Sequence, residues 1–271
     1  MSICLKDLPI IDYSKAMKSK YSVKPDLQKL GHDFGNGNAD GKIFQIDSNF
    51  LSYRAEKIKA REEFLSRYYQ NNLPPESTSI LAKYIISSLI EEYPNFFEVR
   101  KDGNETYFRN KITGEEFLFD EKFNIIRSVN VPFKRYASSL DALACQVQED
   151  LAVMQTDQGS NKLSAGHICF PSSWALEDKI GKDFAQIHSP VPGISLSYSH
   201  ALVESISNKG PFVRFVFGFS NDDSLNHHSS KMPPDSQLCF NTKNPKLFLR
   251  IERQTTSPIQ ELNSSLFTIK L

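Results

Sequence analysis

Two consecutive segments in the first third of the chain carry apolar residues at the spacing of amphipathic helices. The first spans about residues 49–69, with charged residues of both signs between its apolar positions. The second lies between the Pro74–Pro75 pair and Pro94, and these prolines are expected to limit it because proline interrupts helical hydrogen bonding. The two patterns predict an N-terminal helical region over about residues 42–95.

The pattern then changes from helical spacing to a run of aromatic and β-branched residues. Residues 96–129 have this composition, and within them Asp102–Gly103 and Thr113–Gly114 are typical turn pairs. We expect a β-meander in this part of the chain. Over residues 139–154 the apolar positions return to helical spacing, which predicts a further helix.

The C-terminal half mixes both kinds of pattern. Strand patterns occupy residues 167–174, 211–219, 246–255 and 264–271. Helical patterns occupy residues 176–188 and 195–207. Helices that flank an antiparallel sheet define an α+β architecture. We expect residues 1–41, which end in a glycine-rich polar stretch, to be an irregular leader, and residues 42–271 to form a single domain.

Charge and cysteine content limit the classes of function. The 32 basic residues equal the 32 acidic ones, so the chain has no basic excess for nucleic acid or an anionic membrane. No apolar run is long enough to span a bilayer, and the N-terminus lacks the pattern of a secretory signal. Cys4, Cys145, Cys169 and Cys239 are far apart and form no CxxC pair, as expected of reduced thiols. These features predict a soluble cytoplasmic protein.

The six histidines are the first candidates for cofactor binding, and none lies in an HExxH motif or at zinc-ligand spacing. His188 closes the predicted helix over residues 176–188. There it either interacts with the helix dipole or offers the single imidazole that haem iron requires in an apolar slot. His167 faces either the core or a pocket, and we expect His227–His228 to be a solvated loop pair.

Three arginines lie within predicted apolar strands, where an isolated charge is costly unless it is paired. Arg214 belongs to residues 211–219, and Arg250 and Arg253 flank Glu252 in the next strand. Strand alternation places Arg250 and Glu252 on one face and Arg253 on the other. These residues form either a structural Arg–Glu pair or a clamp for a carboxylate ligand such as a haem propionate. The sequence has no GxSxG motif or P-loop that would favour another chemistry.

Three blocks of sequence, in order, resemble the haem-dependent oxidative N-demethylase family. They are residues 147–154 (VQEDLAVM), 167–193 and 249–271. The middle block contains the long pattern FPSSW-x3-DK-x-G-x6-H-x-PVPG. The similarity extends over most of residues 43–271. It implies a PAS-like fold that binds haem b, with an antiparallel sheet, flanking helices and an N-terminal helical region.

The resemblance also implies roles for individual residues. His188 becomes the axial ligand of the iron, and Arg214, Arg250 and Arg253 become propionate-binding or structural residues. Four aromatic residues are then expected to line the apolar slot: Phe170, Trp174, Phe215 and Phe217. Either Glu252 or Tyr198 would hold the ammonium group of the substrate.

The activity implied by the family is the oxidative removal of a methyl group from a small secondary amine such as dimethylamine. The reaction uses O₂ and releases formaldehyde, and its electrons come from NAD(P)H through separate flavin and iron–sulfur subunits. One strand departs from the family pattern, because Arg214 is followed by Phe-Val-Phe where the family commonly has RxNW. This departure leaves an alternative open: a non-catalytic haem sensor or an interaction module on the same fold.

Overall fold

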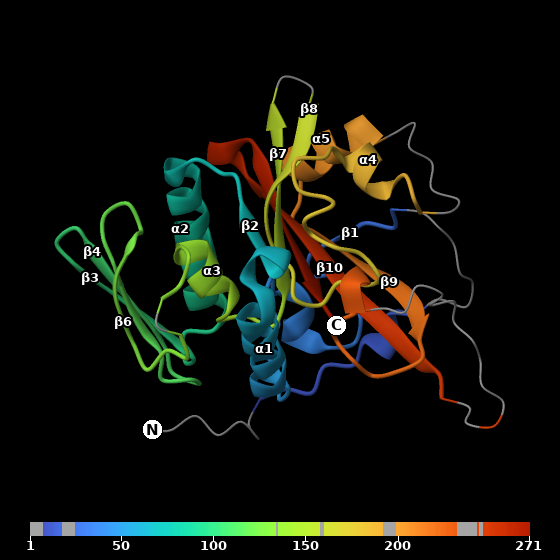
Figure 1. The fold of residues 1–271 in the computed structure, drawn as a ribbon, viewed down its shortest axis with the longest axis horizontal. Helices are drawn as coiled ribbons and strands as arrows, with labels where there is room; N and C mark the ends of the chain where they lie inside the picture. Colours follow the sequence, from blue (N-terminus) through green and yellow to red (C-terminus); the bar gives the residue numbers. More distant parts are fainter. Residues whose placement is uncertain are drawn as a thin grey trace.

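Two antiparallel sheets and five α-helices make up the described part of the chain (Figure 1). The computed structural model describes residues 8–17, 25–133, 135–157, 160–191, 199–231, 243 and 246–271. The larger sheet has seven strands in the order β1-β9-β10-β11-β7-β8-β2, and the smaller is a four-stranded meander, β3-β4-β5-β6. This architecture confirms the predicted α+β class.

The elements have the following bounds. The α-helices are α1 (Phe50–Tyr68), α2 (Pro75–Glu92), α3 (Ser139–Ala144), α4 (Phe184–His188) and α5 (Ser199–Asn208). The strands of the larger sheet are β1 (Gln28–Lys29), β2 (Tyr69–Asn71), β7 (Asp150–Asp157), β8 (Ser160–His167), β9 (Phe212–Ser220), β10 (Phe248–Ile259) and β11 (Ser264–Lys270). Those of the meander are β3 (Phe97–Asp102), β4 (Glu105–Asn110), β5 (Glu116–Phe119) and β6 (Ile125–Val129). Short 3-10 helices are η2 (Tyr13–Ala16), η3 (Gly37–Gly41), η4 (Ser229–Lys231) and η5 (Gln260–Leu262).

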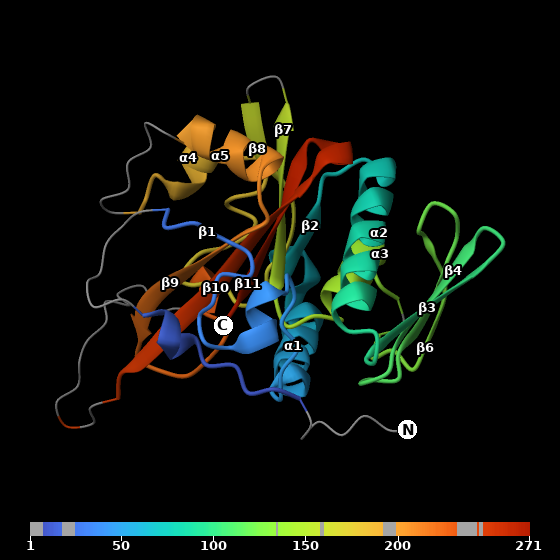
Figure 2. The ribbon, with the colours of Figure 1, turned by 180° about the vertical axis from the view of Figure 1, so that it is seen from behind.

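Helices separate the two sheets. Figures 1 and 2 show α2 and α3 between the meander and the larger sheet, while α4 and α5 lie beside β7 and β8 on the other side. The main hydrophobic core joins α2, α3 and the inner face of the meander to the centre of the larger sheet. Burial of this apolar area from water is the principal stabilising term. The face of the larger sheet away from this core carries a smaller hydrophobic cluster, which includes Ile187 of α4.

The predicted N-terminal helices and the meander are confirmed. The helix expected over residues 49–69 is α1, and the one bounded by prolines is α2. Pro75 occupies the first turn of α2, where the missing N–H has no helical acceptor in any case. In the meander, Gly103 follows directly on the end of β3 at Asp102, and the pair Thr113–Gly114 lies between β4 and β5; both glycines have positive φ.

The helix predicted over residues 139–154 is wrong beyond Ala144. Only α3 is helical, and the chain then turns and becomes β7 from Asp150. The first four residues of β7 are all buried; Leu151 and Val153 lie in the main core, and Ala152 lies in the cluster that includes Ile187 of α4, so both faces of this strand are covered. A strand buried on both faces has a continuous apolar run, which periodicity alone does not distinguish from a helix.

Two further predictions in the next block are wrong in part. The strand expected over residues 167–174 lies earlier, as β8, and ends at His167. The helix expected over residues 176–188 is reduced to α4, with turns before it. Gly181 has φ +81°, a left-handed conformation that ends the preceding turns and lets Asp183 start a new helix.

The segment before α1 is held by side chains from distant elements. Gln28–Lys29 pairs with β9 as an edge strand. Further on, Arg253 donates to the carbonyls of Lys42 and Ile43, and Lys270 donates to the carbonyl of Gln45 and to Asp47. The boundary between a leader and a domain near residue 41 stays a prediction.

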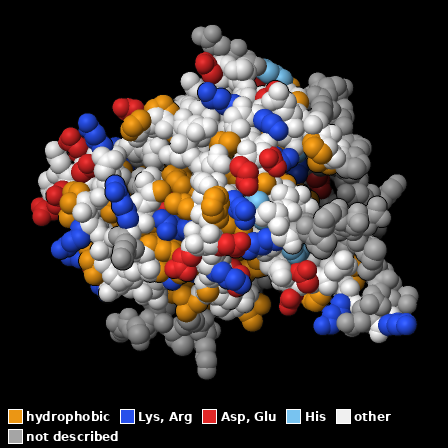
Figure 3. Space-filling model, in the orientation of Figure 1, with side chains coloured by type: hydrophobic (Ala, Val, Ile, Leu, Met, Phe, Trp, Pro, Cys, Tyr) orange, Lys and Arg blue, Asp and Glu red, His pale blue; other side chains and the backbone are white. Residues whose placement is uncertain are grey.

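Acidic and basic side chains are interspersed on the face seen in Figure 3, in keeping with a formal net charge of zero. In the described ranges, none of the helices combines the length and apolar character needed to cross a membrane.

Candidate functional site

His188 is the last residue of α4. This short helix begins with a capping box, in which Asp183 accepts from the backbone of Gln186 and the side chain of Gln186 accepts from the backbone of Asp183. The Nδ1 atom of His188 lies 2.8 Å from the carbonyl oxygen of Phe184, and the two rings stack with centroids 4.0 Å apart. Since a carbonyl only accepts, Nδ1 carries the proton and Nε2 carries the lone pair. This is the tautomer that can coordinate a metal through Nε2.

The imidazole of His188 is also kept neutral. Burial is the main cause of a lowered pKa of His188; the hydrogen bond to Phe184 opposes it, and the charge of Arg214 adds to it. The sheet register places Arg214 and α4 on the same face, because Ile187 of α4 packs with Phe267 of β11, and that face continues through Thr256 and Gln254 to Arg214. A neutral imidazole is the form that binds iron.

Arg214 belongs to a row of polar side chains across β9 and β10. Its Nε atom donates to Oε1 of Gln254 at 2.8 Å, and Nε2 of Gln254 donates to Glu252 at 2.9 Å. Glu252 in turn lies 3.7 Å from Nε of Arg250. Arg250 reaches beyond the row and donates to the carbonyls of Phe170 and Leu225. As predicted, Arg250 and Glu252 share one face.

The sheet places three of the other predicted residues on its opposite face. Phe215 follows Arg214 directly and therefore points away from it, and Arg253 and Phe217 share the face of Phe215. Arg253 is buried, with its guanidinium on the backbone of residues 42–43. Phe215 makes edge contacts with Tyr13 and Phe34, and Phe217 stacks beside it. The structure does not bring these three residues together with His188.

Phe170 and Trp174 belong to different hydrophobic clusters. Phe170 is buried against α1, where its ring meets Tyr53 edge-on at 5.5 Å. Trp174 is half-buried in a cluster that includes Ile187 of α4, the residue before His188. Of the two, Trp174 is the one near α4. Tyr198, the other candidate for substrate binding, lies outside the described residues.

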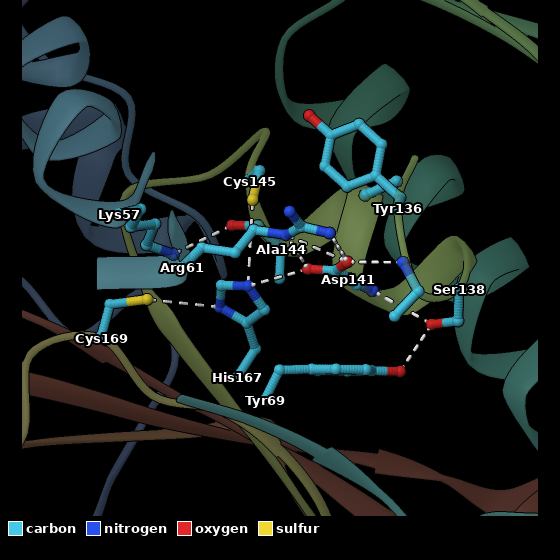
Figure 4. Close-up of polar contacts among 12 residues, drawn as sticks. Lys57, Arg61, Tyr69, Tyr136, Ser138, Asp141, Ala144, Cys145, His167 and Cys169 are labelled. Carbon is cyan, nitrogen blue, oxygen red and sulfur yellow. Dashed lines mark hydrogen bonds and ion pairs between the residues drawn. The ribbon is translucent and has the colours of Figure 1, made fainter. Parts of the chain in front are cut away.

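A second group of reactive side chains is completely buried next to α1 (Figure 4). His167 lies between two thiols: its Nε2 is 3.8 Å from Sγ of Cys145, and its Nδ1 is 3.7 Å from Sγ of Cys169. Nε2 also lies 3.4 Å from Asp141, which accepts two-pronged hydrogen bonds from Arg61. The sequence left open whether His167 faces the core or a pocket, and the structure places it in the core.

Asp141, Cys145 and His167 are close enough for one ion to reach all three. Their surroundings favour a hydrogen-bonded structural network instead. Arg61 already neutralises Asp141, and burial, the main cause, raises the pKa of Cys145 to about 12, so the sulfur stays a neutral thiol. Local sequence carries no sign of this group, because its members come from α1, α3 and β8 and are brought together only by folding.

The burial of the two thiols in this network predicts that they react slowly with alkylating reagents. We expect Cys145 and Cys169 to react with iodoacetamide at least about a hundredfold more slowly in the native protein than in urea, because burial raises the pKa of both thiols. Peptide mapping by mass spectrometry would follow each site separately. Labelling of either cysteine at equal rates in both conditions would contradict this account of the core.

The expectation for the histidine pair is wrong for one member. His228 is only 1 % exposed; its Nε2 lies 3.2 Å from Glu177, and its Nδ1 lies 2.9 Å from Oγ of Ser230. The ring of Tyr68 in α1 covers it edge-on. His227 lies nearer the surface, 2.9 Å from Asp222. The polar sequence around the pair gave no indication that α1 would cover His228.

Together these features describe an α+β protein with a neutral histidine beside a row of charged and amide side chains. Residues 37–271 match the family described as haem-dependent oxidative N-demethylase, alpha subunit-like. The chain belongs to this family. The match leaves out the first 36 residues and covers every element from η3 to β11.

Proposed function

We propose that this chain is a haem-binding protein with a PAS-like fold, and that His188 is the axial ligand of haem b. The observation that carries the proposal is the fixed tautomer of His188, whose Nδ1 is bound to its own helix. Haem proteins orient a ligating histidine in this way, through a hydrogen bond from the other ring nitrogen. The family is described as haem-dependent, which names the cofactor. Nε2 of His188 is the donor atom that α4 offers to haem iron, because Nδ1 is bound to Phe184.

The arginines divide between the two roles that the sequence left open. Arg214 lies on the face of His188 and acts on it electrostatically, which supports a role as the partner of a haem propionate. Arg250 shares this face, and its Nε has no hydrogen-bond acceptor among the described residues. Arg253 is committed to backbone carbonyls on the far face, which supports a structural role.

The reaction we propose is the oxidative demethylation of a small secondary amine. For dimethylamine, O₂, two electrons and two protons convert one methyl group to formaldehyde, with methylamine and water as the other products. Haem would supply the O₂-dependent oxidation of the methyl group. The electrons would come from NAD(P)H through a flavin and iron–sulfur partner. The description of the family as an alpha subunit supports the existence of such a partner. Glu252, a carboxylate on the face of His188, would bind the ammonium form of the substrate.

An absorption spectrum of protein expressed with added haem tests the first half of this proposal. We expect a Soret band that co-purifies with the protein at about one haem per chain. The second half is tested by formaldehyde release from dimethylamine with NADH and a suitable reductase. No Soret band would contradict the haem proposal. Haem binding without formaldehyde from any of a panel of secondary amines would contradict the catalytic one.

The alternative is a non-catalytic haem sensor or interaction module, and one observation favours it. The strand of Arg214 continues as Phe-Val-Phe, and its two phenylalanines point to the face away from His188. Where the family pattern has an asparagine and a tryptophan, this chain offers no polar side chain. Haem binding without turnover in the assays above is the outcome expected of this alternative.

A further inference from the structure

Gln254 occupies the centre of the polar row on β9 and β10. It lies directly opposite Arg214 in the strand register and two residues after Glu252, so all three side chains share one face. Gln254 is 8 % exposed, yet both ends of its amide are bonded: Oε1 to Nε of Arg214, and Nε2 to Oε2 of Glu252. A buried amide satisfied at both ends is held in one orientation.

The direction of these two hydrogen bonds follows from the chemistry of the partners. The guanidinium of Arg214 has only donors, and the carboxylate of Glu252 has only acceptors. The oxygen of the amide must therefore face Arg214, and its NH₂ group must face Glu252. The amide of Gln254 offers an acceptor to one neighbour and a donor to the other from two different atoms of one rigid group. A carboxylate or an ammonium group could serve only one of them.

We propose that Gln254 is a positioning residue that holds Arg214 for the cofactor and Glu252 for the amine in one connected arrangement. This inference rests on the proposed function and adds a residue that the family match does not assign. Without the amide, the guanidinium of Arg214 loses its only side-chain acceptor among the described residues. Among the described residues, Glu252 would keep the ion-pair contact with Arg250, at 3.7 Å.

The row also connects the two ends of the site. At one end, Arg214 lies on the face of the sheet on which α4 packs through Ile187. At the other end, Arg250 anchors the row to the backbone around Phe170 and Leu225. A side chain in the middle of this row can therefore affect the cofactor and the amine separately, according to which of its two bonds is kept.

Two single substitutions separate the two bonds. Gln254→Glu keeps an acceptor for Arg214 but places a carboxylate against Glu252. Gln254→Lys keeps a donor for Glu252 but places an ammonium against Arg214. We expect Gln254→Glu to weaken dimethylamine binding about tenfold with haem affinity within about twofold of wild type, and Gln254→Lys to weaken haem binding about tenfold. Each lost charge-assisted hydrogen bond is worth roughly such a factor.

Haem affinity is measured by Soret titration of the apoprotein, and dimethylamine affinity by the spectral change on titrating the ferric holoprotein. Gln254→Met, which keeps neither bond, should lose both affinities and serves as the matched reference. Thermal midpoints of all three variants show whether the fold is retained. Haem binding by Gln254→Lys that equals wild type, or parallel losses of both affinities in Gln254→Glu and Gln254→Lys, would overturn the inference.

The wild-type protein distinguishes this failure from failure of the proposed function. A wild-type chain that binds no haem overturns the haem proposal itself. A wild-type chain that binds haem but shows no spectral response to dimethylamine overturns the proposal that Gln254 positions Glu252 for the amine. A wild-type chain that binds both, with variants that change neither affinity, overturns the positioning role alone.

Discussion

Substitution of His188 by alanine is expected to abolish axial ligation of haem and to weaken haem binding by more than about 100-fold. The loss of an outer partner of a metal ligand already costs roughly 10–100-fold in affinity, and His188 is the proposed ligand itself. Its neutral tautomer, bound through Nδ1 to the carbonyl of Phe184, leaves Nε2 for the iron. Soret titration of the apoprotein measures the effect directly.

Exogenous imidazole provides a specific rescue for this variant, because it can occupy the space left by the missing ring and restore a nitrogen ligand. His32→Ala is a suitable control, since His32 is exposed and its ring meets that of Phe34. A Soret band in His188→Ala with the position and intensity of the wild-type band would exclude His188 as the ligand. A band lost equally in His32→Ala would show that the spectra do not report on α4.

The second large effect is expected in the buried network beside α1. Arg61→Met should lower the free energy of unfolding by about 3–5 kcal/mol, because it leaves the carboxylate of Asp141 buried without its cationic partner. Asp141 has no exposed side-chain area, and Arg61 meets it with two parallel hydrogen bonds. Urea unfolding followed by circular dichroism measures the change.

A matched control lies on the same helix. Arg67 of α1 pairs with Glu63 at 3.9 Å on the surface, and Arg67→Met should cost less than about 1 kcal/mol because solvent screens exposed pairs. The double variant Arg61→Met with Asp141→Asn should recover part of the lost stability. Equal losses in Arg61→Met and Arg67→Met would show that the buried pair has no special weight.

The effect of Arg61→Met should also depend on pH. Burial alone would raise the pKa of Asp141, but hydrogen bonds from His167 and Arg61 outweigh it and lower the pKa from 3.8 to about 2. A carboxylate with a lowered pKa in the folded state stabilises the protein above its unfolded pKa and loses this contribution as the pH falls. The difference between wild type and Arg61→Met should therefore shrink between about pH 4 and pH 2.

Local patterns predicted the elements whose burial is one-sided. The turn glycines and aromatic alternation of residues 96–129 specify the meander, whose strands β4 and β5 alternate between buried and more exposed positions. The same alternation placed Arg250 and Glu252 on one face. It also contained Gln254, which shares that face and could have been recognised from the period of two.

The sequence pattern predicts a helix where the chain forms β7, and the physical reason for this error also applies to the proposed site. Periodicity reports on burial only when one side of an element is in water, and β7 is covered on both faces. In the same way, the local sequence around Arg214, Phe215 and Phe217 gives their alternation but not which face of β9 lies towards His188. The pairing of β9 with β10 and the position of α4 decide this.

For this protein, the sequence by itself determined the α+β class, the family and the position of His188 at the end of a helix. These depend on short-range patterns and on motifs that are contiguous in the chain. Tertiary structure alone decided that His228 is buried under α1 and that Arg61, Asp141 and His167 form one network. It also decided that the sheet divides the proposed haem-binding residues between two faces. These outcomes depend on contacts between residues far apart in the chain, which the free energy of packing selects and local spacing does not encode.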